Sequence, residues 1–240
     1  MMRVRLSLRR AGLFLAFFAL ALVALFPMRI MLGALGLGAV GLSVREVQGS
    51  VWHGKLKEVR FGAAALGDVD AGLNFFPLFV GRARIDASRA GEGGDALQGA
   101  LSVTRHTLGL DDATMRLPAA AIFAPLPVSA VDLGDVSVRF REGVCDRAEG
   151  LVRAELQADV PGLSLPGGMS GTARCDGGAL LLPLASQSGM EMLALRIVKN
   201  GGYTADFTVR SSDPAVQQAL QTHGFAPSGD GLKLSVAGQL

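Results

Sequence analysis

The sequence predicts an all-β protein: a mainly antiparallel, twisted sheet, either curled or divided into two halves, with one N-terminal transmembrane helix and one short helix near the C-terminus. Three observations support this class. Residues 11–28 carry no charge. Beyond residue 46, apolar and polar residues alternate with a period of two, which is typical of half-buried strands. The 240 residues include 32 glycines and few aromatic residues, which suits short strands joined by turns.

The N-terminal helix is expected over residues 11–28, because 18 helical residues rise about 27 Å, close to the roughly 30 Å apolar core of a bilayer. Four arginines precede this run and favour a cytoplasmic N-terminus: Arg3, Arg5, Arg9 and Arg10. A cleaved signal peptide and a buried soluble helix are the alternatives. The length of the run and the absence of a small-residue cleavage site after it favour a retained anchor.

The charge distribution argues against nucleic-acid binding. Six basic residues and no acidic residue precede Glu46, whereas the rest of the chain has 17 basic and 21 acidic residues, a net charge of −4. A nucleic-acid-binding domain would concentrate positive charge on its folded part. The expected organisation is a basic cytoplasmic tail (1–10), the transmembrane helix (11–28), a connector along the membrane surface (29–45) and a β-domain across the membrane (46–240).

The alternation predicts strands in several stretches, of which residues 151–160 and 203–210 are the clearest. The sequence Asn200-Gly201-Gly202 predicts the turn of a β-hairpin over residues 191–210. Further strands are expected at residues 49–62, 83–88, 135–140 and 232–238. Short connections between one-sided strands imply antiparallel pairing.

One short helix is expected after Asp213, which is a suitable N-cap, with Pro214 in the first turn and Gly224 just beyond the end. Val216 and Leu220 would face the sheet. The proline-containing stretch 123–128 is expected to cross between two halves of the sheet.

The stretch GSVWHG contains the single tryptophan, Trp52. We expect it to begin the first strand, with Trp52 in the core and His53 as an exposed or half-exposed neighbour. Gly49 and Gly54 would permit a tight entry, a bulge or a close backbone approach. A catalytic or ligand site at this Trp-His pair is the alternative.

Cys145 and Cys175 are the two cysteines, and an oxidising compartment would make them a disulfide. Two buried free thiols remain the alternative, and a metal site would need ligands that are not spaced nearby. We predict no metal site and no cofactor. The chain has no phosphate loop, no G-x-S-x-G and no H-E-x-x-H, and its histidines are scattered, so we expect no enzyme and no small-molecule substrate.

The order of these features resembles the type II secretion system protein N family. The similarity begins with the basic flank, the apolar span and VQGSVWHGKL, in which Gly49, Val51, Trp52 and Gly54 match a family motif. It continues through FFPLFVGRARID, GVCDRAEGLVRAEL, GTARCDGGALLLPLASQSG and GGYTADFTVRSSDP to LKLSVAGQL.

The resemblance implies an accessory of the machine that exports folded proteins from the periplasm across the outer membrane. Its β-domain would be periplasmic, its anchor would lie in the inner membrane, and its partners would be other secretion-system components. The alternative is a tethered envelope protein of the AsmA type, whose sheet curls into a groove for lipid or acyl chains.

Overall fold

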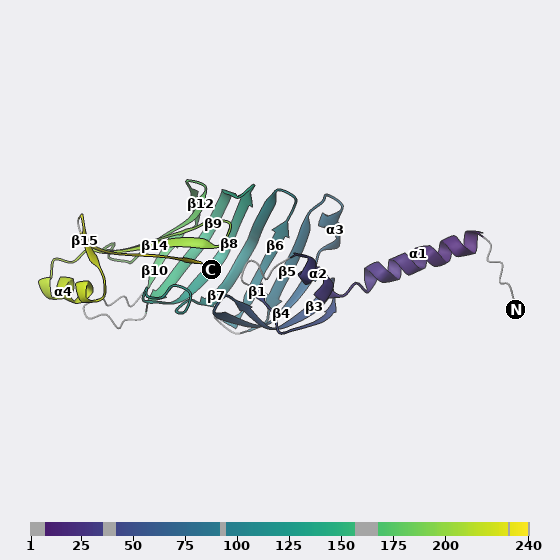
Figure 1. Ribbon diagram of the computed structural model, residues 1–240, viewed down its shortest axis with the longest axis horizontal. Coiled ribbons are helices and arrows are strands. Elements are labelled where there is room, and N and C mark those ends of the chain that lie inside the picture. Colours follow the sequence, from purple (N-terminus) through teal and green to yellow (C-terminus); the bar gives the residue numbers. More distant parts are fainter. Residues whose placement is uncertain (1–7, 36–41, 92–94, 157–167, 230, 240) are drawn as a thin grey trace.

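The computed structural model describes residues 8–35, 42–91, 95–156, 168–229 and 231–239, and shows one long twisted sheet with an apolar helix projecting from one end (Figure 1). The helices are α1 (Leu8–Ala24), α2 (Met28–Leu35), α3 (Phe75–Leu78) and α4 (Pro214–Thr222). The strands of the first half are β1 (Leu42–Ser43), β2 (Glu46–Ser50), β3 (His53–Phe61), β4 (Ala64–Leu73), β5 (Ala83–Arg89), β6 (Leu97–Val103), β7 (Thr107–Pro118) and β8 (Val128–Arg141). Those of the second half are β9 (Val144–Leu156), β10 (Met169–Thr172), β11 (Arg174–Asp176), β12 (Ala179–Ala185), β13 (Glu191–Ile197), β14 (Gly202–Val209), β15 (Ala226–Ser228) and β16 (Gly231–Gln239).

The sheet is a nearly continuous meander, which confirms the predicted antiparallel class. Its order is β1-β3-β4-β5-β6-β7-β8-β9-β10-β12-β13-β14-β16-β15, with β2 also paired to β3 and β11 to β12. Most neighbours in space are neighbours in sequence, because short turns can join antiparallel strands.

The alternating pattern places its apolar residues as predicted. Strand β14 buries Tyr203, Ala205, Phe207 and Val209, and pairs with β13 across the expected hairpin turn. Strand β9 buries Val152 and Ala154 and is described to Leu156, so the remainder of the predicted strand 151–160 lies outside the described residues.

Paired β-bulges bend the middle of the sheet. Asp112 in β7 and Asp135 in β8 both adopt a φ of 51°, and the β7–β8 register shifts around them. The Asp112 backbone N–H donates to Ser137 Oγ at 2.9 Å, and that of Asp135 donates to Thr114 Oγ1 at 3.1 Å. These side chains replace ladder bonds that the bulges interrupt, so the bend is fixed by specific hydrogen bonds.

The larger apolar core lies where the C-terminal strands curl over β8 and β9. It joins residues of β8, β9, β12, β13 and β14 with Phe123 and Leu126 from the β7–β8 connection. Tyr203 donates its hydroxyl to the Ile122 carbonyl at 2.7 Å, and its ring meets Phe123 edge-on at 5.2 Å. The cavity among these residues holds about 10 Å³, room for at most one water molecule.

The stretch 123–128 therefore does not cross between two halves of the sheet, contrary to the prediction. It connects the adjacent antiparallel strands β7 and β8, and it buries Phe123 and Leu126 in the core that the curled sheet encloses. The prediction failed because prolines mark an interruption of a strand without specifying where the next strand pairs.

The C-terminal helix α4 is confirmed. The Asp213 side chain accepts a hydrogen bond from the Ala215 N–H at 2.8 Å, and Pro214 occupies the first turn. Leu220 is fully buried and Val216 packs against the same core. Gly224 follows the helix with a φ of 89°, a conformation that glycine adopts without steric cost.

The N-terminal helix is shorter than predicted. Helix α1 ends at Ala24, whereas the prediction ran to Met28. Pro27 disfavours helical geometry at Phe26, whose carbonyl accepts from the Val51 N–H at 2.9 Å. Met28 is fully buried and begins α2. Across the residues that the structure describes, no helix combines the length and the apolar character needed to cross a membrane.

The predicted connector 29–45 contains most of α2 and the short strand β1. Helix α2 packs against β2, and its Met28, Met31 and Leu32 join the second apolar core. That core is completed by residues of β3, β4 and β5. The segment between α1 and the sheet therefore forms part of the folded N-terminal end of the sheet.

Candidate functional site

The GSVWHG stretch forms a hairpin turn between β2 and β3, not the continuous opening strand that the sequence predicted. Val51 and Trp52 occupy the turn, and Ser50 pairs with His53. Gly49 has a φ of 87°, and a Cβ there would collide with the His53 carbonyl. Gly54 lies against the Met28 side chain, where a Cβ would come within 3.0 Å of Cγ. The two glycines therefore permit close contacts of the backbone, as expected.

Trp52 is half-buried, so the expectation of a tryptophan within the core is only partly right. Val51 takes the buried position, with 3% of its surface exposed. The Trp52 indole N–H donates to the Val23 carbonyl in α1 at 2.9 Å, and the ring meets Phe75 edge-on at 5.6 Å. His53 is exposed, as predicted. Trp52 thus joins the last turn of α1 to the sheet and to α3.

A groove of about 860 Å³ opens beside Trp52, between α1 and strands β3, β4 and β5. Its apolar lining includes Leu20 and Val23 from α1 together with Leu73 and Phe75. Its lining also includes polar side chains, namely Lys55, Asp70, Asp86 and Ser88. The groove is therefore lined by both apolar and charged side chains.

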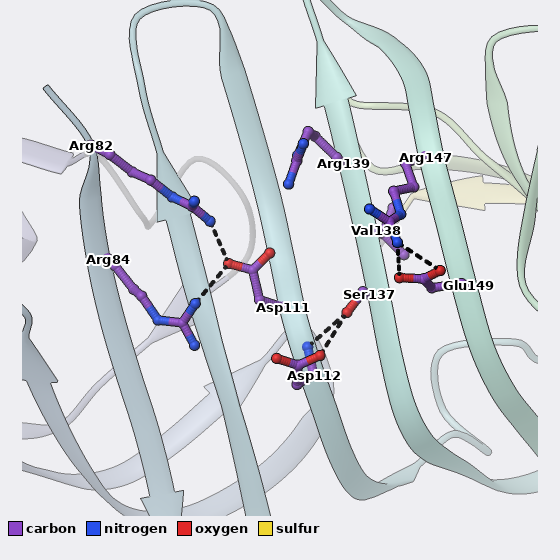
Figure 2. A pocket seen from close by; sticks show the side chains of 9 residues that line it. All are labelled: Arg82, Arg84, Asp111, Asp112, Ser137, Val138, Arg139, Arg147 and Glu149. Atoms are coloured by element: carbon purple, nitrogen blue, oxygen red, sulfur yellow. Dashed lines mark hydrogen bonds and ion pairs between the residues drawn. The ribbon is translucent and has the colours of Figure 1, made fainter. Parts of the chain in front are cut away.

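A second candidate surface is a shallow charged pocket of about 200 Å³ on the sheet (Figure 2). At its centre, Arg82 and Arg84 converge on the Asp111 carboxylate, with N–O distances of 2.9 and 3.4 Å. Ser102 donates its hydroxyl to the same carboxylate. Asp111 is thus held in one orientation by three donors.

The charged pocket continues across β8 and β9. Ser137 donates to Asp112 Oδ1 at 3.1 Å, Arg147 pairs with Glu149 at 2.8 Å, and Arg139 lies beside them (Figure 2). In the sequence, Asp111 and Asp112 stand only as an adjacent acidic pair. The basic partners come from other strands, so strand pairing was needed to find this cluster.

A further ion-pair cluster crosses β7, β8 and β9. Arg116 lies 3.4 Å from Asp132 and is hydrogen-bonded to both carboxylate oxygens of Glu155. The hydrogen bond from Arg116 is the main cause that lowers the pKa of Glu155. This group remains ionised at neutral pH and adds to the fixed charges of the sheet.

The two cysteines are bonded to each other, which fits the predicted disulfide. Cys145 in β9 and Cys175 in β11 have a Cα–Cα distance of 5.5 Å. The Cys145 N–H also donates to the Gly178 carbonyl at 2.8 Å. The bond therefore fastens the β11–β12 hairpin to β9.

The groove beside Trp52 and the charged pocket are the two candidate binding surfaces described above. Among the described residues, no group of three or more His, Cys, Asp and Glu side chains could hold a metal ion. His53 lies in β3, His106 in the β6–β7 turn and His223 just after α4. Of the predicted topology residues, Arg9 and Arg10 lie in the first turn of α1, and Arg3 and Arg5 lie outside the described residues.

Comparison with known proteins identifies the family to which this chain belongs. The family model for type II secretion system (T2SS), protein N, matches residues 40–235, and the chain belongs to this family, as the sequence motifs predicted. The chain is 30% identical over 138 residues to the type II secretion system protein N of Vibrio cholerae serotype O1 (strain ATCC 39315 / El Tor Inaba N16961). That match covers 52% of this chain and 54% of the relative, so the chain spans about half the length of the curated relative that it matches. No solved structure matches the chain.

Proposed function

We propose that the chain is an inner-membrane-anchored accessory of the type II secretion system. It supports the export of folded proteins from the periplasm across the outer membrane, and it acts through protein–protein contacts. The family match over residues 40–235 carries this proposal, because it covers nearly the whole sheet.

Membrane anchoring is proposed through α1 and the residues just after it, not through Met28, which is buried against the sheet. Ten large apolar side chains between Leu13 and Phe26 are exposed, and Figure 1 shows α1 projecting away from the sheet. Such a surface is unfavourable in water, because each buried aliphatic or aromatic side chain gains about 1.5–3 kcal/mol. With residues 1–10 in the cytoplasm, the sheet would lie on the periplasmic side.

The charged pocket of Figure 2 is the proposed contact surface for a secretion partner. Its side chains are fixed by mutual hydrogen bonds, which is suitable for a polar interface that selects partners by charge. The edge of the sheet formed by β15 is poorly suited to the addition of another strand, because β15 has three residues and includes Pro227. The opposite edge is formed by β1 and β2, which both pair with β3.

A lipid-binding role of the AsmA type is the second candidate, and the groove beside Trp52 is the observation that favours it. Its volume of about 860 Å³ is within the range of small-molecule sites. The core under the curled strands offers only about 10 Å³, so an acyl chain would have to bind in the groove. Phospholipid that co-purifies with the protein, and is lost when a larger side chain is placed in the groove by Ser88→Leu, would support this candidate.

Photo-crosslinking in cells tests the proposed contact. A photoreactive residue at Arg139 should form an adduct with another secretion-system component, and the adduct should be weakened by charge reversal at Arg147. The same residue at Gln218, exposed on α4, is the matched control. If the photoreactive residue at Arg139 gives no protein adduct in cells that are actively secreting, or none beyond that at Gln218, the contact role of this pocket is wrong.

A further inference from the structure

The connection between β4 and β5 displays an unusual apolar surface. It consists of α3 and the two residues after it, Phe75–Val80, which we call the aromatic turn. Phe76, Phe79 and Val80 expose 83%, 75% and 80% of their surfaces. Single exposed apolar residues are common, but a contiguous set marks a surface that contacts something apolar.

The aromatic turn is a folded unit whose side chains are held outward. The backbone N–H groups of Phe79, Gly81 and Arg82 donate within the turn, to the carbonyls of Phe76, Leu78 and Pro77 at 3.0–3.2 Å. The Phe75 and Phe79 rings meet edge-on at 5.0 Å. Because these backbone donors are satisfied internally, the turn can enter an apolar medium without leaving them unpaired.

The aromatic turn is continuous with the apolar surface of α1. Phe75 contacts the Trp52 ring, and Trp52 is hydrogen-bonded to Val23 in α1. Figure 1 shows α3 at the end of the sheet nearest α1. Phe26 and Ile30, between the helix and the sheet, are also exposed. An apolar environment that surrounds α1 would therefore extend to the aromatic turn as well.

The charges around the aromatic turn suit the surface of a bilayer. Arg29 is exposed at the start of α2, and Arg82 and Arg84, which follow the turn, are ion-paired with Asp111. Tryptophan and basic residues are characteristic of the membrane–water interface. A protein partner would more commonly meet an apolar patch that is surrounded by a polar rim, and here the patch continues directly into α1.

We infer that the aromatic turn inserts into the outer leaflet of the inner membrane beside the end of α1. This inference rests on the proposed anchoring of α1. Two contacts, the helix and the turn, would fix the orientation of the sheet relative to the membrane, whereas a single helix would leave it free to tilt. The depth expected for such an interfacial contact is about 5–10 Å.

Depth-dependent fluorescence quenching tests the inference on the full chain. The native cysteines are bonded to each other, so a Phe76→Cys variant can be labelled with an environment-sensitive fluorophore in vesicles of phosphatidylethanolamine and phosphatidylglycerol. The emission should shift to the blue and be quenched more by lipid with a nitroxide near the headgroup than by lipid with one at the chain end. Phe79→Cys should behave alike and replaces Phe76→Cys if that variant does not fold.

Two controls separate this inference from the anchoring itself. A label at Met190, which is exposed on the β12–β13 connection, should keep a water-like emission and no quenching. A label at Phe17 in α1 should be quenched by the lipid. If Phe17 is quenched but positions 76 and 79 are not, the turn does not enter the bilayer and only this inference fails. A blue shift at position 76 without quenching by any lipid would show that protein covers the turn, which also overturns the inference. If Phe17 is not quenched either, both the anchoring and the inference are wrong.

Discussion

Removing the disulfide with the double variant C145A/C175A should destabilise the sheet by about 3–4 kcal/mol. The cysteines are 30 residues apart, and closing a loop of that length reduces the entropy of the unfolded chain by about this amount at 25 °C. Because Cys145 is buried, the smaller alanine adds a small packing loss. For a chain of this size, the total corresponds to a fall in Tm of roughly 7–14 °C.

Urea unfolding in detergent micelles, followed by circular dichroism, measures this effect. A reducing agent should lower the unfolding midpoint of the unsubstituted protein towards that of C145A/C175A and leave the variant unchanged. If the variant unfolds at the same urea concentration as the oxidised protein, then the link between β9 and β11 does not constrain the unfolded chain, and the reasoning is refuted.

Three further substitutions test separate parts of the structure by urea unfolding. Trp52→Phe should lower the free energy of unfolding by about 0.5–1.5 kcal/mol, since a smaller aromatic ring is kept but the hydrogen bond to the end of α1 is lost. No change would show that this bond does not hold α1. Leu220→Ala should lower the free energy of unfolding by about 2–5 kcal/mol, because the side chain is fully buried, whereas Gln218→Ala, at an exposed position of α4, should have little effect. Equal effects of the two substitutions would contradict the packing of α4 against the core. Burial alone would raise the pKa of Asp206, but the hydrogen bonds from Ser235 and Lys233 outweigh it, so the net shift is downward. The ionised carboxylate therefore stabilises the fold above pH ~4, and this contribution is lost as the pH falls through the lowered pKa. Asp206→Asn should therefore be less stable than the parent at pH 7, by at most about 1 kcal/mol because the Asp206–Lys233 pair is partly exposed, and the difference should vanish in acid. A difference that stays constant with pH would show that the ionised carboxylate is not its cause.

The strands could be predicted from the sequence because burial on one face of a sheet imposes a period of two. Residues 203–210 and 83–88 are examples in which the pattern is local and complete. The helix α4 was also predictable from local signals, since Asp213 and Pro214 stabilise the first helical turn, in which they lie. The disulfide followed from the number of cysteines and the expected compartment.

The predictions that failed concern features that depend on contacts between residues distant in sequence. Helix α1 ends early because the chain after it pairs with Val51, and Trp52 leaves the core because the hairpin turn gives the buried position to Val51. The charged pocket around Asp111 requires knowledge that β5 and β7 lie on either side of β6. The aromatic turn was not predicted, because a run of apolar residues does not reveal whether its side chains face a core.

The most direct measurement of the central claim is the distribution of an exported enzyme between periplasm and medium in a strain that lacks the protein. The account predicts that the enzyme reaches the periplasm normally, accumulates there and is depleted from the medium. The full chain should restore export, and a version that ends after residue 45, which keeps α1 but lacks most of the sheet, should not. Normal export from the deletion strain, together with an altered permeability of the envelope to lipophilic compounds, would contradict the secretion role and favour the lipid-binding candidate.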